Sequence, residues 1–260
     1  MEPPWQDPVR CMRQQVVDDP QLLELMVQDY LRSSGEFGAS ARWLQYSDRF
    51  LAYLREQGLK DFRSRRHPKG TPGAVLASFG AVDLNPSFDR CSPIDLYHAA
   101  ATCYLGEGAV HISQLSPSQV ASPEGFCIDG RFYTLSWLNF YCRYAYVSKF
   151  VRFERQTIVE VGCGSGKQAE LLKKAHPDLT IVLFDLPTQL YVAHQYLAAV
   201  FSDSDEVVDY RTTRTFRSFD DIRRRKINIL PNWLFPIVRD CSRRRDRPAL
   251  ERCQLSGNGS

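Results

Sequence analysis

The sequence predicts an α/β fold in which a mainly helical N-terminal region precedes a parallel β-sheet. Two observations lead to this class. Apolar residues recur at helical spacing over residues 19–57. Residues 157–200 instead alternate short β-branched runs with helical stretches, in the order strand, helix, strand, helix. Of the 260 residues, 43% are hydrophobic and 24% charged, which is typical of a folded protein.

The N-terminal region is expected to begin with two amphipathic helices. Asp19 and Pro20 form a helix start signal, and the apolar residues that follow are spaced to lie on one helix face. A second helix is expected over residues 40–57, with Gly58 as its stop. The apolar residues of this second helix are Trp43, Leu44, Phe50, Leu51 and Leu54.

Irregular segments are expected to connect these helices to the sheet. Residues 61–90 are rich in Arg, Gly, Pro and Ser, with GTPG at 70–73 as the clearest break, and predict a surface loop. A third helix is expected from Ser92 to near Gly106. Residues 113–125 hold four serines and two prolines and predict another irregular connection. Residues 135–151 predict an aromatic helix, whose rings we interpret as core packing rather than as an acceptor pocket.

The chemical motif starts at Thr157. The β-branched run TIVEVG is followed by the glycine turn CGSGK and a helical stretch, and the second strand, LTIVLFD, ends at Asp185. Glycines at 162, 164 and 166 let the backbone turn tightly and let a ligand approach. The helix that begins there offers unpaired N–H groups and its positive dipole end to an anionic group. Asp185 is placed to accept both hydroxyls of a ribose. The motif therefore indicates an adenosine-containing ligand.

Two other nucleotide motifs fit the spacing less well. A phosphate-binding P-loop needs a glycine where the chain has Val161 and a Ser or Thr where it has Gln168. Lys167 is therefore expected to be a surface residue. In the dinucleotide fingerprint the third glycine comes three positions after the second, whereas Gly166 comes after two. Nicotinamide and flavin cofactors consequently rank second.

The string VEVGCGSG, with Asp185 downstream, resembles the cofactor loop of the S-adenosylmethionine-dependent methyltransferases. This resemblance implies a Rossmann-like sheet and S-adenosyl-L-methionine as the cofactor. In that family the glycine loop carries the methionine end of the cofactor, and the acid after the second strand binds the ribose. The cofactor-binding residues implied here are Glu160, Gly162, Gly164, Gly166 and Asp185.

A narrower resemblance covers about residues 125–238. The segments HPDLTIVLFDLPTQLYVAHQYL and INILPNWLFP are similar to the sugar O-methyltransferases of bacterial and algal glycan clusters. The FDLP string also occurs in O-methyltransferases of the caffeate and hydroxyindole type, but the aromatic helix at 191–196 and the LPNW segment favour the sugar family. The glycine loop departs from that family at Cys163, Ser165 and Lys167. The resemblance implies methyl transfer to a hydroxyl of a sugar or glycan.

The domain organisation expected is a mainly helical region over residues 1–130, a partial methyltransferase domain over 131–240 and a basic disordered tail over 241–260. Strands are predicted at 157–162, 180–185 and 227–230, with 207–211 as a competitor of the third. A complete doubly wound domain has about six strands. We therefore expect a C-terminally truncated domain, and a catalytically inactive remnant or partner subunit is the alternative function.

The sequence assigns neither a catalytic base nor a metal site. His194 is expected to be solvated, His176 to be a helix-end residue favoured by the dipole, and Cys163 to be a packed thiol rather than a nucleophile. The eight cysteines form no Cys-x-x-Cys pair, and the five histidines lack metal-ligand spacing.

Several other classes of protein are disfavoured. No apolar run approaches the roughly 20 residues of a spanning helix, and the first residues do not form a secretory signal, so a cytoplasmic location is expected. Residues 211–252 carry a net charge of +8 and the remainder −5, which raises nucleic acid as a partner. No nucleic-acid-binding fold is recognisable, and we interpret these arginines as a solvated surface.

Overall fold

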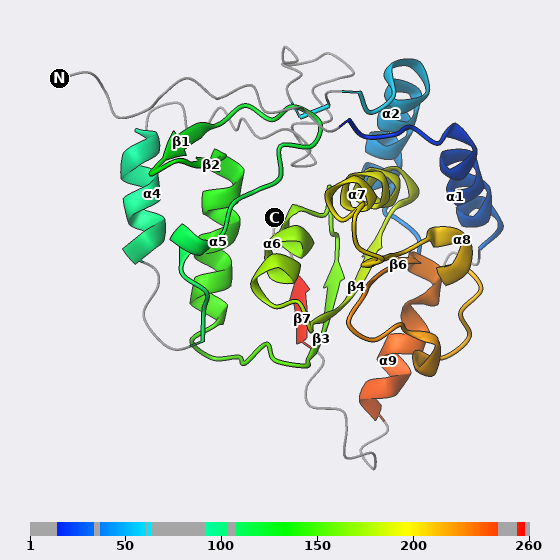
Figure 1. Cartoon of the computed structure of the whole chain (residues 1–260). Coiled ribbons are helices and arrows are strands. Elements are labelled where there is room, and N and C mark those ends of the chain that lie inside the picture. Colours follow the sequence, from blue (N-terminus) through cyan, green and yellow to red (C-terminus); the bar gives the residue numbers. More distant parts are fainter. Residues whose placement is uncertain are drawn as a thin grey trace.

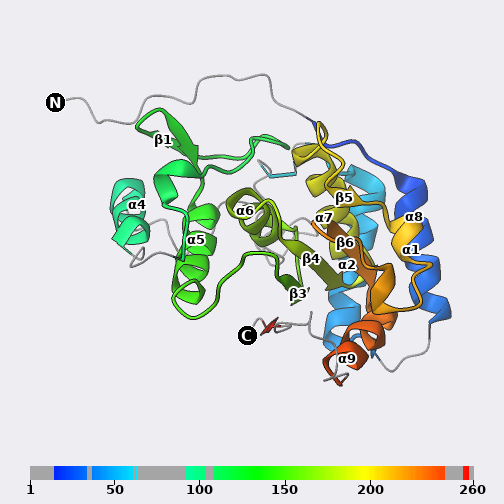
Figure 2. The same cartoon turned by 60° about the horizontal axis from the view of Figure 1, so that its bottom comes forward.

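A parallel β-sheet with helices on both faces organises the chain, which confirms the α/β class (Figures 1 and 2). The computed structural model describes residues 15–33, 37–60, 62–63, 92–102, 108–243 and 254–257. Most of the loop expected over 61–90, including GTPG, lies outside these residues. No helix within the described ranges is long and apolar enough to cross a membrane.

The strands of the sheet are all parallel to their neighbours. Their order is β5-β6-β4-β3-β7. Of these five strands, β3 comes first along the chain, and it has β4 on one side and β7 on the other. The predicted strands are present, and the competing segment contributes the two-residue β5. The carboxyl ends of β3, β4 and β6 meet at one edge. The strands are β3 (Thr157–Val161), β4 (Thr180–Asp185), β5 (Val207–Val208), β6 (Ile227–Pro231) and β7 (Gln254–Gly257).

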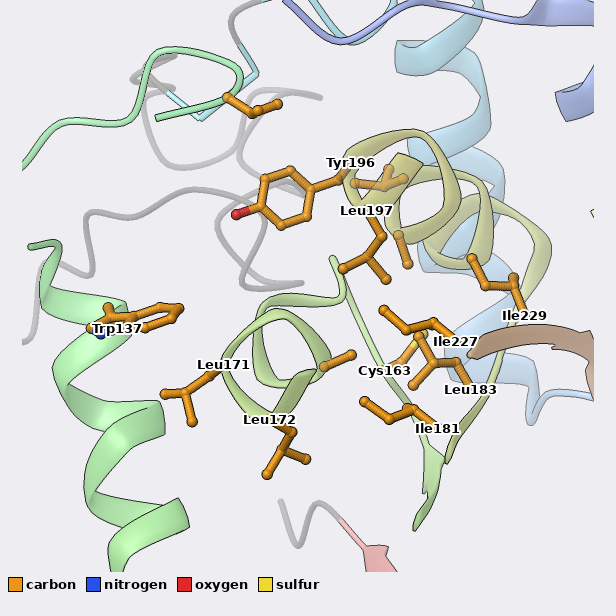
Figure 3. Packing of buried hydrophobic residues seen from close by; sticks show 14 of the residues in the cluster. Trp137, Cys163, Leu171, Leu172, Ile181, Leu183, Tyr196, Leu197, Ile227 and Ile229 are labelled. Atoms are coloured by element: carbon orange, nitrogen blue, oxygen red, sulfur yellow. The ribbon is translucent and has the colours of Figure 1, made fainter. Parts of the chain in front are cut away.

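Alternating side chains divide the core into two layers. Ile158, Ile181 and Leu183 belong to the larger cluster, which also contains the apolar faces of α6 (Lys167–Ala175) and α7 (Pro187–Val200). Figure 3 shows this layer around Leu171, Leu197 and Ile227. The intervening residues, such as Val182 and Phe184, form a second cluster with α9 (Phe235–Arg243). Both faces of the sheet are therefore covered, as is typical of parallel sheets.

The N-terminal helices extend the layer that α6 and α7 form. Helices α1 (Pro20–Arg32) and α2 (Ala41–Gln57) both pack on α7. Helix α5 (Leu135–Val147) packs on α6 on one side and on α4 (Pro93–Thr102) on the other. The predicted signals act as expected. Asp19 Oδ1 accepts a hydrogen bond from Leu22 N at 2.9 Å, and Gly58 ends α2 with φ +56°.

A buried polar network ties the irregular segment before the hairpin to α6 and α7. Glu170 on α6 is fully buried and accepts hydrogen bonds from Ser118 N at 2.6 Å, from Lys174 Nζ at 2.7 Å and from the Tyr196 hydroxyl. Arg63, also buried, donates to the Tyr196 hydroxyl at 3.0 Å and to the carbonyl of Ser118 at 2.8 Å. The network fixes α6, and with it the start of the predicted site.

The structure differs from the sequence predictions at the hairpin, in the C-terminal segment and at the end of the aromatic helix. A hairpin joins β1 (Phe126–Ile128) and β2 (Arg131–Tyr133), and its turn residues Asp129 and Gly130 both have positive φ. Where a disordered tail was expected over residues 241–260, α9 continues to Arg243, and residues 254–257 form β7, which pairs with β3. The aromatic helix, expected over residues 135–151, ends at Val147.

The remaining short elements are η3 (Ile112–Gln114), α8 (Tyr210–Thr213), η4 (Phe219–Asp221) and η5 (Asn232–Leu234).

Candidate functional site

The predicted glycine turn lies between the carboxyl end of β3 and the first residue of α6. Gly162, Gly164 and Gly166 have φ values of +82°, +56° and +78°, so each adopts the left-handed region that favours glycine. Their N–H groups donate to Phe184 O at 2.8 Å, to Asp185 Oδ2 at 2.8 Å and to Cys163 O at 3.0 Å, respectively. Because these donors are engaged, an incoming anion would depend on the first turn of α6.

The first and third glycines have different surroundings. A Cβ added to Gly162 would meet no atom within 4 Å. A Cβ at Gly166 would lie 2.8 Å from Leu197 Cδ1 and 3.4 Å from Ala193 Cβ, so this glycine permits α6 to approach α7 closely. The turn therefore leaves space for a ligand beside Gly162, at its start, whereas Gly166, at its end, lies in the contact between α6 and α7.

Asp185 fixes the turn from the neighbouring strand. Its Oδ2 accepts the hydrogen bond from Gly164 N at 2.8 Å, and its Oδ1 accepts one from Leu186 N at 2.7 Å. Burial raises the pKa of this carboxyl to about 6, although the two backbone N–H groups oppose the shift. Each carboxylate oxygen can accept more than one hydrogen bond, so the pair retains capacity for ligand hydroxyls.

Glu160 lies on the same face of the sheet as Asp185. Glu160 follows Ile158 by two residues on β3, and Asp185 follows Leu183 by two residues on β4, so each points to the same face of the sheet as that apolar residue. Ile158 and Leu183 both belong to the larger core cluster. The Glu160 side chain is buried, and its Oε2 has no hydrogen-bond partner among the described residues. Burial and then the charge of Asp185 raise the pKa of Glu160 to about 8, while Arg143 on α5 opposes the shift.

The remaining residues considered from sequence are placed as follows. Cys163 is buried, and burial followed by the nearby carboxyls raises the pKa of its thiol, so a packed, unreactive thiol is the result. His176 caps α6 at its carboxyl end, where its ring stacks on Phe153 at 4.9 Å. That position is the end of α6 opposite the glycine turn.

Two expectations of solvent exposure are wrong. Lys167, the first residue of α6, is only 3% exposed. His194 is 5% exposed, and its Nε2 accepts a hydrogen bond from Tyr210 N at 3.3 Å. Burial lowers the pKa of His194. The burial of His194 depends on a contact with another helix, which the periodicity of a single helix does not reveal.

Two further polar residues at the same sheet edge were missed from sequence. Gln189 lies in the first turn of α7, just after β4, and Asn232 directly follows β6. Gln189 Nε2 and Asn232 Oδ1 are buried without a hydrogen-bond partner among the described residues. Polar residues just beyond the carboxyl ends of parallel strands are the signal that could have found them.

The aromatic helix serves mainly the core. Trp137, Tyr141 and Tyr144 of α5 are buried, whereas Tyr146 is 61% exposed and Phe150, just beyond the helix, is 71% exposed.

In the part of the chain that the structure describes, no group of three His, Cys, Asp or Glu side chains could hold a metal ion.

Comparisons with protein families, with curated proteins and with solved structures found no match to this chain. The site consists of a glycine turn at a helix N-terminus, with the buried carboxyl of Glu160 and the partly buried carboxyl of Asp185 from adjacent strands beside it.

Proposed function

We propose that the chain is an S-adenosyl-L-methionine-dependent O-methyltransferase with a Rossmann-like cofactor domain. The observation that carries this proposal is the contact of Asp185 with Gly164 N, which joins the acid after the second strand to the glycine turn after the first. This is the arrangement in which a carboxylate can bind a ribose beside a helix N-terminus.

The sheet topology supports a ligand at this position. The chain runs from β3 to β4 and β6 on one side, and β7 then pairs with the other side of β3. In open α/β sheets, ligands bind beyond the carboxyl ends of the strands where the strand order reverses. The reversal here is at β3, whose carboxyl end leads directly into the glycine turn.

The polar groups present fit the proposed cofactor. Asp185 would accept the ribose hydroxyls, the first turn of α6 would face the carboxylate, and Glu160 would lie near a cationic group. When bound, S-adenosyl-L-methionine supplies an electrophilic methyl group on a sulfonium. The protein must then align the acceptor hydroxyl and receive its proton. We assign no catalytic base, because neither His176 nor His194 lies at the turn.

The N-terminal region is proposed to cover part of the acceptor side. Asn232, which follows β6, donates to the backbone carbonyl of Phe37, and the Phe37 ring lies 5.7 Å from that of Phe235. The segment before α2 therefore reaches the carboxyl edge of the sheet. The acceptor class, a sugar or glycan hydroxyl, rests on the sequence resemblance over about residues 125–238.

Methyl transfer tests this function directly. We expect the chain to move label from methyl-labelled S-adenosyl-L-methionine to a hydroxyl within a panel of sugars and oligosaccharides, and Asp185→Ala to reduce transfer at least tenfold. Asp178→Ala is the matched control, because that aspartate is exposed and lies before β4, at the opposite edge. Transfer only to phenols or hydroxyindoles would contradict the sugar acceptor. Binding without any transfer would favour the inactive remnant or partner subunit.

A further inference from the structure

The C-terminal end of α5 exposes a group of apolar side chains to solvent. Tyr146 is 61% exposed, Val147 is 37% exposed and Phe150, just beyond the helix, is 71% exposed. The ring centres of Tyr146 and Phe150 lie 5.3 Å apart. In Figures 1 and 2 this end of α5 extends past α4 before the chain turns toward β3. Single exposed apolar residues are ordinary, but a contiguous group indicates an interaction surface.

The backbone and the buried side of α5 hold this group in place. Phe150 N donates to the carbonyl of Val147 at 2.9 Å, so the helical spacing continues past the last residue of α5. Phe150 therefore shares a face with Val147 and Tyr146, three and four positions earlier. On the buried side, the Tyr144 hydroxyl lies 2.9 Å from His176 Nε2, at the carboxyl end of α6. The exposed group is thus fixed near the end of α6 that is opposite the glycine turn.

Positive charge surrounds the apolar group. Residues 143–155 contain four cationic side chains and one acidic side chain, that of Glu154. The Nζ atom of Lys149 lies 6.0 Å from the centre of the Tyr146 ring. All four cationic residues are exposed, and among the described residues no ion pair involves them; they are Arg143, Lys149, Arg152 and Arg155. The surface is therefore complementary to a partner that is both anionic and apolar.

We propose that Tyr146, Val147 and Phe150, together with these four cations, bind the face of a lipid bilayer that contains anionic lipids. We call this set of residues the α5 surface. The two rings lie at the level of the headgroups, where aromatic side chains with a polar tip are favoured. The cations face the lipid phosphates, and each adds to the attraction. This inference goes beyond the proposed function and does not depend on it.

The ring geometry and the size of the α5 surface favour a bilayer over other partners. Single-stranded nucleic acids stack their bases on open ring faces. Here Phe150 contacts the Tyr146 ring at an interplanar angle of 62°, and Lys149 lies over the same ring. A stable protein interface involves about 20–30 residues on each side, whereas this surface has only three exposed apolar residues. Its like charges also oppose pairing with a second copy of the same surface.

Co-sedimentation with lipid vesicles tests the proposal. We expect the chain to bind vesicles of about three parts phosphatidylcholine to one part phosphatidylglycerol, and to bind pure phosphatidylcholine vesicles about tenfold more weakly. Raising the salt concentration from about 0.1 M to about 1 M should weaken the binding, because the Debye length falls from about 10 Å to about 3 Å.

Removal of the two rings tests the apolar part of the surface. The double variant Tyr146→Ser with Phe150→Ser should bind the anionic vesicles about tenfold more weakly than wild type. Both side chains are exposed, so the variant is expected to fold. Leu31→Ser is the matched control, because Leu31 is 75% exposed and belongs to α1, on the side of the molecule away from α5 in Figures 1 and 2. This control should bind like wild type.

Removal of two cations tests the charged part. Lys149→Gln with Arg152→Gln should weaken binding to the anionic vesicles about tenfold and leave binding to pure phosphatidylcholine unchanged. Arg223→Gln with Arg224→Gln removes the same charge from exposed residues just before β6, and should weaken the binding far less.

Each outcome decides for or against the α5 surface as a bilayer site. Equal binding by wild type and the ring variant, binding that ignores the anionic lipid, or no binding to any vesicle would overturn it. Binding of a single-stranded polynucleotide that the ring variant loses would assign the surface to nucleic acid instead. A change of oligomeric state in the ring variant, measured by sedimentation velocity, would assign it to a second copy of the chain. Circular dichroism checks that each variant folds, and if the ring variant does not, the charge variant decides.

Discussion

Replacing Gly166 with alanine is expected to lower the free energy of unfolding by about 3 kcal/mol. The residue has φ +78°, which an L side chain adopts only with strain. The new Cβ would also lie 2.8 Å from Leu197 Cδ1, and Leu197 is fully buried. Either α6 must move away from α7 or the leucine must leave its position. Chemical denaturation monitored by circular dichroism measures the effect.

Gly130→Ala separates the two causes. Gly130 has φ +72°, but a Cβ there meets nothing within 4 Å, so this control should show only the backbone strain, about 1–2 kcal/mol. Adding Leu197→Ala to Gly166→Ala should remove the collision of the new Cβ with Leu197. Equal losses in Gly166→Ala and Gly130→Ala would show that close packing between α6 and α7 does not require the third glycine.

Replacing Glu170 with alanine is the second large effect, and we expect a loss of about 3 kcal/mol. The substitution removes the acceptor for Ser118 N, the Tyr196 hydroxyl and Lys174 Nζ in a buried environment. Removing one partner of a buried ion pair leaves the other charge and its donors uncompensated. Urea denaturation at pH 7 is the measurement.

Glu24→Ala is the control for Glu170→Ala. Glu24 also forms a 2.7 Å ion pair, with Arg55, but the side chains of Glu24 and Arg55 are 41% and 50% exposed to solvent. An exposed pair contributes about 0–1 kcal/mol, so the loss should be correspondingly small. If both substitutions cost the same, the network between α6, α7 and the segment around Ser118 would not stabilise the fold as described.

Local signals explain why much of the fold was predictable. The Asp19 cap, the Gly58 stop and the β-branched runs at 157–162 and 180–185 each act over a few residues, and the structure contains the corresponding elements. The Asp129-Gly130 turn was also such a signal but was not recognised. Helix α9 was missed because the residues after Pro236 show little apolar periodicity, although α9 begins at Phe235 and continues to Arg243.

Burial, in contrast, depends on contacts between distant segments. Periodicity within α7 does not show that α1, α2 and α8 enclose its other faces, which is why His194 was expected in solvent. The proximity of Asp185 to the glycine turn was predictable, because both belong to one strand–helix–strand unit. The burial of Gln189 Nε2 and Asn232 Oδ1 without partners could not be predicted, because it depends on how β4 pairs with β6, and the sequence alone does not give that pairing.

Binding of S-adenosyl-L-methionine to the purified chain, followed by calorimetry, tests the central proposal most directly. The account predicts saturable binding in the micromolar range, which Asp185→Ala abolishes and Asp178→Ala preserves. Asp185→Asn, which retains an acceptor for Gly164 N, should fold and bind far more weakly than wild type. A folded wild-type sample that gives no binding heat, or one that binds equally well with Asp185→Ala, would contradict a cofactor site at the glycine turn.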